Sequence, residues 1–170
     1  MFDIRLKFED IEILSIEKED LGRIHEWYVK EENSSHKFQG ESINENQFYE
    51  RFLEYYLSEC EFFLKIIRNK ELVGIMKGRI EFKNPNEVWI GYLMLDNCFR
   101  GKALGSKVLK EIIKYFCIEC GICNFYVKVK EKNFSFISFL RKNKFEVLRF
   151  SQEQGKSIKN SFVVLTKIIQ

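Results

Sequence analysis

The chain has 170 residues, 45% of them hydrophobic and 31% charged, which is the composition of an ordinary soluble globular protein with one domain, residues 1–170. No apolar run is long enough to span a bilayer, and the N-terminal residues lack the apolar core of a signal peptide, so we expect a cytoplasmic protein. The formal net charge is only +3, and basic residues alternate with acidic and apolar ones, which argues against nucleic-acid binding.

The two parts of the chain differ strongly in charge. Residues 1–60 hold 15 Asp and Glu against 7 Lys and Arg, a net charge of −8, whereas the remainder holds 10 against 21, a net charge of +11. An acidic surface attracts cationic partners, and a basic surface attracts anionic ligands. The alternative is that both sets of charges are solvated and meet no partner.

The first sixty residues predict short strands followed by two helices. Apolar and polar residues alternate over residues 2–16, which indicates one strand or a broken pair. Helical spacing begins at Asp20, a candidate N-cap, and a polar loop covers residues 31–40. A second helix begins near Asn44, and its aromatic face is more typical of a protein core than of a binding site. That face comprises Phe48, Phe52, Leu53, Tyr55 and Tyr56.

Three strands joined by short turns are predicted next. They cover Glu61–Arg68, Leu72–Phe82 and Val88–Leu95. Because the turns have only a few residues, the strands should be antiparallel neighbours. The third strand is almost entirely apolar, as is typical of a strand that is covered on both faces.

A small-residue turn and an amphipathic helix follow the third strand. Gly101, Ala103 and Gly105 leave the main chain accessible, while Arg100 and Lys102 add positive charge. A helix that starts in such a turn directs unpaired N–H groups and the positive end of its dipole at an anion, so the pattern predicts an anion site. The alternative is a turn that binds nothing. The apolar positions of the helix are Leu104, Val108, Leu109, Ile112, Ile113 and Phe116.

Three cysteines lie close together where this helix ends. Cys117 and Cys120 fall near the end of the helix, Gly121 is its predicted C-terminal cap, and Cys123 precedes the next strand. No histidine nearby completes a tetrahedral set, so we interpret these thiols as small buried apolar groups and expect no metal. An odd number of cysteines without a repeating framework also fits a reducing compartment.

The C-terminal part predicts a strand, a helix and two further strands. The first strand covers Asn124–Lys130, and Asn133 opens a helix of about ten residues. Strands then cover residues 145–150 and 162–169, and a polar excursion over residues 151–160 separates them.

Two segments resemble a known family. The run from Arg100 to Ser106 is similar to the R-x-x-G-x-G/A signature of the GNAT family of N-acetyltransferases, with Ala103 in place of the middle glycine. The run from Asn133 to Phe145 resembles that family's N-x-x-A/S-I-x-L/F-Y-x-K-x-G-F segment. Its departures are Phe136 for a small residue, Lys144 for a turn glycine and Leu140 for a tyrosine.

The resemblance implies an α/β fold of the GNAT type, with a mixed and mostly antiparallel central sheet of about six to seven strands flanked by about four helices. It also implies acetyl-CoA as cosubstrate, held by the turn at its pyrophosphate and by the apolar strand at its pantetheine arm. A backbone N–H near Leu95 would meet the oxyanion. The cofactor-binding residues implied in this way are Leu93, Met94, Leu95, Arg100, Gly101, Lys102, Ala103, Leu104, Gly105, Ser106, Asn133 and Phe136.

The family's usual catalytic glutamate is missing from the apolar strand. Where a common form of that strand reads A-E-I-G-Y, this chain has Trp89 in place of the glutamate. Glu87 shares a face with Trp89 by period-two alternation and is the candidate general base, with Glu81 and Tyr92 as weaker substitutes. The alternative for Glu87 is a solvated surface residue. Leu140 replaces the tyrosine that protonates the leaving thiolate in many relatives, but a thiol with a pKa of about 8.5 can leave without it.

The sequence and the resemblance together predict an enzyme that transfers an acetyl group from acetyl-CoA to a primary amine. The acidic N-terminal part favours a small cationic acceptor of the aminoglycoside or polyamine type. A protein acetyltransferase acting on an N-terminus or a lysine is the alternative within the enzyme class, and a non-catalytic acyl-CoA sensor is the alternative outside it. We expect neither nucleic acid nor a membrane among the partners, and a homodimer is left open.

Overall fold

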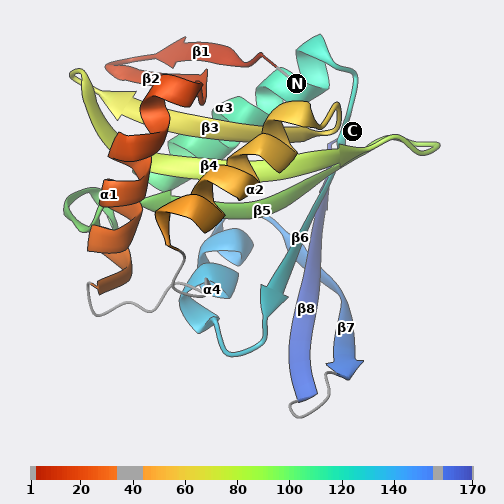
Figure 1. The fold of residues 1–170 in the computed structure, drawn as a ribbon. Helices are drawn as coiled ribbons and strands as arrows, with labels where there is room; N and C mark the ends of the chain where they lie inside the picture. The colour runs from red at the N-terminus through yellow and green to blue at the C-terminus, as the bar shows by residue number, and fades with distance from the viewer. Residues whose placement is uncertain (1–2, 34–43, 155–158, 170) are drawn as a thin grey trace. The chain divides into compact units, whose positions relative to one another are not determined.

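The structure of the chain is a computed structural model that describes residues 3–33, 44–154 and 159–169. These residues form four α-helices and an eight-stranded sheet in the order β1-β2-β3-β4-β5-β6-β8-β7 (Figure 1). The predicted class, a mostly antiparallel mixed sheet with helices, is confirmed. The sheet has one strand more than the six to seven expected, and residues 2–16 form the broken pair that their alternation allowed as one of two possibilities.

The chain divides into two compact units, which are described in turn. Unit 1 comprises residues 1–77 and 92–104, and unit 2 comprises residues 78–91 and 105–170. Two long strands, β4 (Glu71–Glu81) and β5 (Glu87–Leu95), contribute residues to both units. The expectation of a single domain over residues 1–170 stays a prediction.

Unit 1 begins with a β-hairpin. β1 (Arg5–Phe8) and β2 (Ile11–Ser15) pair antiparallel, and β2 pairs antiparallel with β3 (Glu61–Arg68). Glu9, in the hairpin turn, has a φ of 49°, which lies in the left-handed region that two-residue turns use. Buried and half-buried residues alternate along β2, in agreement with the predicted period of two.

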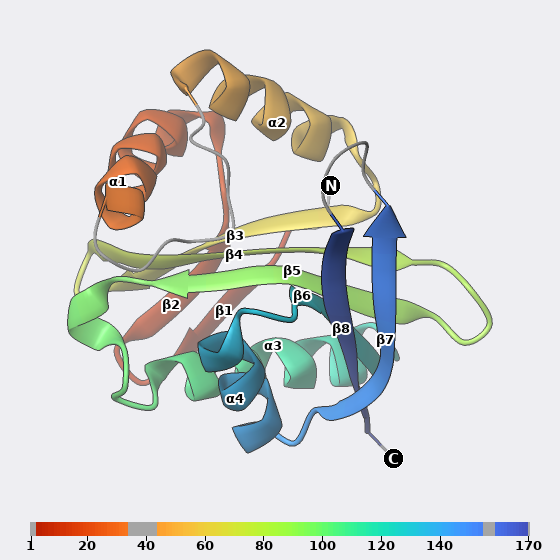
Figure 2. The ribbon, with the colours of Figure 1, turned by 90° about the horizontal axis from the view of Figure 1, so that it is seen from below.

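Two helices complete unit 1, and both lie on the same side of β3 (Figure 2). The first is α1 (Leu21–Asn33), which extends into the predicted polar loop; the rest of that loop, residues 34–40, lies outside the described residues. The second is α2 (Glu45–Leu57), whose predicted start is confirmed, because the Asn44 side chain accepts a hydrogen bond from the Gln47 N–H at 2.9 Å.

Asp20 differs from its predicted role as the N-cap of α1. It ends the 3₁₀ helix η1 (Lys18–Asp20), and its carboxylate accepts a hydrogen bond from the Glu17 N–H at 2.8 Å. The same carboxylate forms a 2.5 Å ion pair with Lys65 of β3. The sequence signal for a capping carboxylate was correct, but a tertiary ion pair moved the cap to the turn before the helix.

The core of unit 1 is aromatic. Phe48 and Tyr55 of α2 both pack against Phe63 of β3, with ring centroids 6.4 Å and 5.8 Å apart. The prediction that the aromatic face of α2 belongs to the core is confirmed for Phe48, Phe52 and Tyr55, which are buried. It is wrong for Leu53 and Tyr56, which point to solvent with 38% and 50% of their surface exposed.

Unit 2 contains the remaining strands. β6 (Asn124–Lys130) pairs with β5 in parallel from Glu87 opposite Asn124 to Ile90 opposite Val127, and it pairs antiparallel with β8 (Lys159–Ile168). β7 (Glu146–Gln154) pairs antiparallel with β8. The predicted polar excursion over residues 151–160 is therefore wrong at both ends, because main-chain hydrogen bonds extend the hairpin through polar residues; residues 155–158 lie outside the described part.

Two helices belong mainly to unit 2. They are α3 (Leu104–Glu119) and α4 (Phe134–Lys142). The predicted cap of α3 is confirmed, because Gly121 has a φ of 66° and the Ile122 N–H donates to the Phe116 carbonyl at 2.9 Å.

The three cysteines lie at the predicted places along the chain, but they are less buried than predicted. Cys117 is on α3, Cys120 follows it, and Cys123 directly precedes β6; all three are half-buried. Burial, followed by a hydrogen bond with Cys123, raises the pKa of the Cys117 thiol to about 11. Among the described residues, no group of His, Cys, Asp and Glu is arranged to hold a metal ion.

In the part of the chain that the structure describes, none of the helices combines the length and the apolar character that crossing a membrane requires.

Candidate functional site

The turn between β5 and α3 has left-handed backbone at two positions. Gly101 has a φ of 73° and Ala103 has a φ of 62°. Glycine adopts this conformation without steric cost, whereas alanine pays roughly 1–2 kcal/mol for it. Ala103 occupies the position of the missing motif glycine, and its backbone lies in the region that glycine adopts most readily.

The turn is open to solvent. Gly101, Lys102 and Ala103 are exposed, and a Cβ atom added to Gly101 would meet no atom within 4 Å. Leu104, the first residue of α3, is buried and fixes the helix start. The first N–H groups of any α-helix lack partners within it, so a small-residue turn at this point can present main-chain donors to a ligand.

A short 3₁₀ helix, η2 (Asn97–Phe99), leads into the turn. The Asp96 side chain caps it by accepting a hydrogen bond from the Cys98 N–H at 2.8 Å. The Asp96 N–H donates to the Val73 carbonyl of β4 at 2.9 Å, which ties the start of this segment to unit 1. Asp96 is thus a structural residue of the turn.

Arg100 has a structural contact that the sequence did not predict. Its Nε donates a 2.7 Å hydrogen bond to the Leu95 carbonyl, joining the turn to the end of β5. Next to it, the Arg68 guanidinium lies 5.5 Å from the centre of the Phe99 ring, and its Nε forms a 2.6 Å ion pair with Asp10. Side chains from the hairpin turn and from β3 therefore support the segment before α3.

The end of β5 is closely packed in unit 1. Met94 and Leu95 are buried, and Leu93 is half-buried. A Cβ atom on Gly74 of β4 would come within 2.5 Å of the Met94 carbonyl oxygen and 2.6 Å of a Leu95 methyl carbon. Glycine at this position is therefore required by the close approach of the β5 backbone.

β5 has two different surroundings along its length. The parallel register with β6 covers only the first four residues of β5, Glu87 to Ile90. In the described part of the chain, no residue of β6 pairs with β5 from Gly91 onward. Main-chain groups must find hydrogen-bond partners, so an edge that lacks a neighbouring strand can pair with a ligand.

Glu87, the candidate base, belongs to a network of side chains in unit 2. Its Oε2 accepts hydrogen bonds from Trp89 Nε1 at 2.9 Å and from Lys83 Nζ at 3.2 Å. Lys83 also pairs with Glu81, and Arg79 binds Glu81 at 2.6 Å. The hydrogen bonds from Lys83 and then Arg79 lower the pKa of Glu81, which keeps that carboxylate charged.

Trp89, the residue that replaces the family glutamate, is part of an aromatic stack. Its ring lies on Tyr126 of β6 with a centroid distance of 5.0 Å and an interplanar angle of 20°. The Arg79 guanidinium lies 5.6 Å from the Trp89 ring centre. The substitution therefore supplies packing between strands and a hydrogen-bond donor to Glu87.

Tyr92 lies in unit 1 and packs edge-on against Phe63, with ring centroids 6.2 Å apart. Burial raises the pKa of its phenol above the ordinary value. A phenol with a raised pKa stays protonated at neutral pH, so Tyr92 is suited to donate a hydrogen bond and unsuited to act as a base.

Asn133 and Phe136 lie at the start of α4. Asn133 is the N-cap, and its Oδ1 accepts a hydrogen bond from the Phe136 N–H at 3.2 Å. The Phe136 ring stacks on Phe139 with centroids 5.9 Å apart. Leu140 is buried, so the position of the family tyrosine contributes to the core of unit 2. Whether Asn133 and Phe136 also contact a cofactor stays a prediction.

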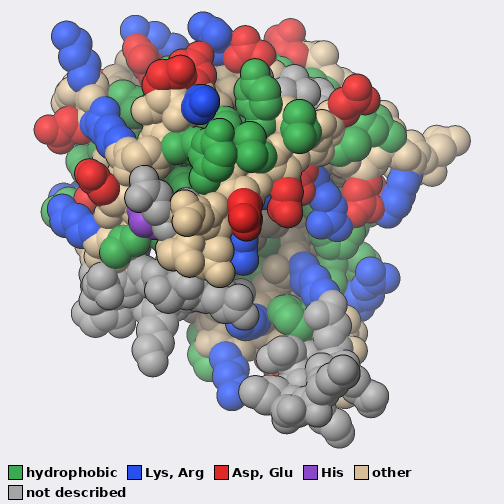
Figure 3. Space-filling view, viewed as in Figure 1, with side chains coloured by type: hydrophobic (Ala, Val, Ile, Leu, Met, Phe, Trp, Pro, Cys, Tyr) green, Lys and Arg blue, Asp and Glu red, His purple; other side chains and the backbone are tan. Residues whose placement is uncertain are grey.

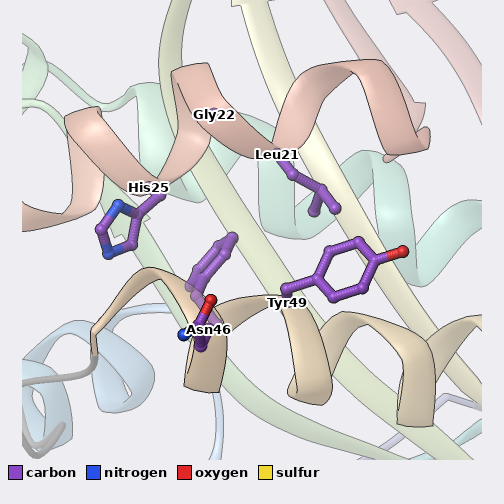
Figure 4. Close-up of a pocket in the computed structure, with 6 residues that line it drawn as sticks. Leu21, Gly22, His25, Asn46 and Tyr49 are labelled. Carbon is purple, nitrogen blue, oxygen red and sulfur yellow. The ribbon is translucent and has the colours of Figure 1, made fainter.

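A hollow between α1 and α2 was not predicted from the sequence. It has a volume of about 150 Å³, and His25 and Tyr49 lie on opposite sides of it (Figure 4). His25 packs against the Phe48 ring at 5.4 Å. The sequence signal for this hollow is weak. Polar and aromatic residues occur one helical turn apart on each helix, as Asn46 and Tyr49 do on α2. The lining residues are Leu21, Gly22, His25, Asn46, Phe48 and Tyr49.

Comparison with known proteins gives one family. The family model described as "Acetyltransferase (GNAT) domain" matches residues 13–162. No curated protein matches this chain. Many solved structures do, and those reported below are acetyltransferases.

RimL, a ribosomal-protein alpha-N-acetyltransferase, superposes in its apo form with a TM-score of 0.86 at 16% identity, covering 99% of this chain and 96% of that one. Its complex with coenzyme A gives a TM-score of 0.81 at 16% identity over 95% and 96% of the two chains. A chimera of the spermidine N-acetyltransferase SpeG from Vibrio cholerae superposes with a TM-score of 0.77 at 12% identity. The superposition covers 94% of this chain and 96% of the chimera.

At these identities the superpositions establish the fold, and the family model establishes the family. The match spans most of the chain and includes both segments on which the resemblance was based. The chain therefore belongs to the GNAT family of acetyltransferases, enzymes that take their acetyl group from acetyl-CoA.

Proposed function

We propose that this protein transfers the acetyl group of acetyl-CoA to a primary amine of a small cationic acceptor. The observation that carries the proposal is the turn before α3, where Gly101 and Ala103 adopt left-handed backbone immediately ahead of the helix. Such a turn brings successive main-chain N–H groups together, which suits the two phosphates of a diphosphate.

Each residue of the turn has a separate part in the proposal. Gly101 and Ala103 set the backbone, and Gly105 and Ser106 contribute N–H groups from the first turn of α3. Lys102 is exposed and supplies positive charge. Arg100, assigned from the sequence as a second charge, is given a positioning part in addition, because its Nε is hydrogen-bonded to the Leu95 carbonyl.

The end of β5 is proposed to hold the pantetheine arm. Leu93, Met94 and Leu95 follow the point at which the register with β6 stops, which supports main-chain pairing with the amides of that arm. Acetyl-CoA, when bound, supplies a thioester carbonyl that an amine can attack. The Leu95 N–H is proposed to stabilise the oxyanion that develops on this carbonyl.

Glu87 is proposed as the general base as an alternative to the Leu95 assignment, because eight steps of extended strand, roughly 26 Å, separate the two residues and both cannot act on one thioester carbon. An alkyl amine has a pKa of about 10, so a group on the protein has to remove its proton before it can attack. Glu87 is a partly covered carboxylate on the family strand, with 18% of its side chain exposed. Its contacts with Lys83 and Trp89 hold the carboxylate in one orientation.

The acceptor class rests on charge. The acidic first sixty residues, with a net charge of −8, favour a protonated amine. Two rivals are retained. The first is a protein acetyltransferase, since a protein N-terminus or lysine is also cationic. The second is a non-catalytic acyl-CoA sensor, which would need neither a general base nor the tyrosine that Leu140 replaces.

A panel of amines tests the proposal. Purified protein is incubated with acetyl-CoA and spermidine, an aminoglycoside, a peptide with a free N-terminus or a lysine peptide, and the release of free thiol is measured. We expect the small polycations to give the fastest release. Faster release with a peptide would overturn the acceptor class in favour of a protein acetyltransferase, and cofactor binding without turnover of any amine would identify a sensor.

A further inference from the structure

The outer face of α2 exposes large apolar side chains at helical spacing. They lie one or two turns apart, so they form one stripe along the helix, and the space-filling view shows hydrophobic side chains gathered over α2 (Figure 3). The opposite face of the same helix fills the core of unit 1. The stripe comprises Tyr49, Leu53, Tyr56 and Leu57, with exposed fractions of 38%, 38%, 50% and 79%.

The stripe continues into the hollow between α1 and α2. Tyr49 belongs to both, since it is the first residue of the stripe and one of the residues that line the hollow. The hollow, about 150 Å³ in volume, is several times the roughly 30 Å³ that a water molecule occupies. A ridge of apolar side chains beside a hollow is the arrangement that receives a helix with one anchoring side chain.

Acidic side chains lie along one flank of the stripe, and the single basic residue of α2 is Arg51, which follows Glu50. Glu50 and Glu54 are exposed and lie one turn apart on the same flank of it. Glu26 on α1 is also exposed. From Leu21 to Leu57, the segment that includes both helices, the chain holds 7 Asp and Glu against 4 Lys and Arg, a net charge of −3.

These charges distinguish between two occupants. If a second copy of α2 packed antiparallel on the stripe, each flank would meet its own copy, and Glu50 and Glu54 would face like charges. A helix with lysine or arginine beside its apolar face would meet opposite charges instead. We propose that the stripe and the hollow form a docking surface for a basic amphipathic helix of a partner protein.

A synthetic peptide provides the probe. It is a labelled helical peptide with leucine at the a and d positions of its heptads and lysine at the others, and its control carries glutamate in place of lysine. Fluorescence anisotropy with the full-length protein is expected to show binding of the lysine peptide, weakening as salt is added, and no comparable binding of the glutamate peptide.

Two variants test the surface itself. Leu53→Asp is expected to weaken binding of the lysine peptide at least about tenfold, because it removes an apolar contact at the centre of the stripe. The double variant Glu50→Lys and Glu54→Lys is expected to exchange the preference, so that the glutamate peptide binds better. Phe82→Asp is the control, since Phe82 is also exposed, at 62%, but lies in unit 2. Circular dichroism confirms that each variant is folded.

Three outcomes would overturn the proposal. The first is equal binding of the two peptides, and the second is unchanged binding to Leu53→Asp. The third is a dimer mass in light scattering that falls to the monomer mass in Leu53→Asp, because a second copy would then cover the surface.

Discussion

The two ends of β5 are built in different ways. At the end in unit 1, Leu95 passes into a turn whose shape is set by main-chain dihedral angles at Gly101 and Ala103. At the start in unit 2, Glu87 is held by side chains, through Lys83 and Trp89. The turn depends on the dihedral angles of consecutive residues, whereas the side-chain network also depends on the chain path after β4, which brings Lys83 to Glu87. We therefore expect cofactor binding to fail by local changes at the Leu95 end, and the Glu87 network to fail by the loss of single side chains.

The largest expected effect is at the turn. Gly105→Asp places a carboxylate in the first turn of α3, where a phosphate is proposed to bind, and two like charges about 4 Å apart cost several kcal/mol in a protein environment. Affinity for coenzyme A should fall at least about 100-fold by calorimetric titration. Gly22→Asp, at an α1 position where an added Cβ has open space, is the control. Wild-type affinity in Gly105→Asp would refute the assignment of the turn.

The next largest effect is expected at the start of β5, where Glu87 is the proposed base. Glu87→Gln should lower the acetylation rate about 100-fold while coenzyme A affinity stays unchanged. Glu71→Gln, at an exposed glutamate at the start of β4, serves as control. An unchanged rate in Glu87→Gln would exclude this residue as the base.

The close packing of β4 on β5 gives the next effect. Gly74→Ala should destabilise the protein by about 1–3 kcal/mol in urea unfolding, because the new methyl group would collide with the Met94 carbonyl. The same substitution at Gly22, where there is space, should stabilise by about 0.5–1 kcal/mol through helix propensity. Equal effects at the two positions would contradict the packing argument.

Arg100 separates positioning from charge. Arg100→Lys keeps the charge but loses the Nε hydrogen bond to the Leu95 carbonyl, so coenzyme A affinity should fall about tenfold with an unchanged dependence on salt. Lys102→Gln should instead reduce the salt dependence. If Arg100→Lys binds like the wild type and Arg100→Gln loses the salt dependence, Arg100 acts as a charge alone.

The smallest expected effect is at the motif position that departs from the family. Ala103→Gly should raise the unfolding free energy slightly, by about 1 kcal/mol or less, because glycine removes the strain of the left-handed backbone. The freedom that glycine adds to the unfolded chain offsets part of this gain. Urea denaturation measures it. A loss of more than that would show that the alanine methyl makes a contact of its own.

Local patterns explain what the sequence could predict. The bounds of β6 followed from alternation alone, and the turn before α3 followed from small residues at positions where side chains are costly. The anion site was inferred in the same way, since a helix start needs no distant partner to offer N–H groups.

Tertiary contacts explain what it could not. Lys65 on β3 decided the role of Asp20, and β8 extended β7 through polar residues. The contacts of Glu87 depend on a turn that brings Lys83 back to it, and the hollow beside His25 exists only once α1 and α2 have packed. The helical spacing of polar and aromatic residues on α1 and α2 does not by itself predict how the two helices pack.

The left-handed backbone at residue 103 also sets which substitutions this position accepts in a saturation library. Asparagine, aspartate and glycine tolerate that region of backbone space, whereas valine, isoleucine and threonine do not, since their branching at Cβ clashes with the carbonyl group. Whether a side chain is tolerated at position 103 should therefore depend on branching at its Cβ atom instead of on its polarity. A substitution table built on hydrophobicity would rank them in the wrong order.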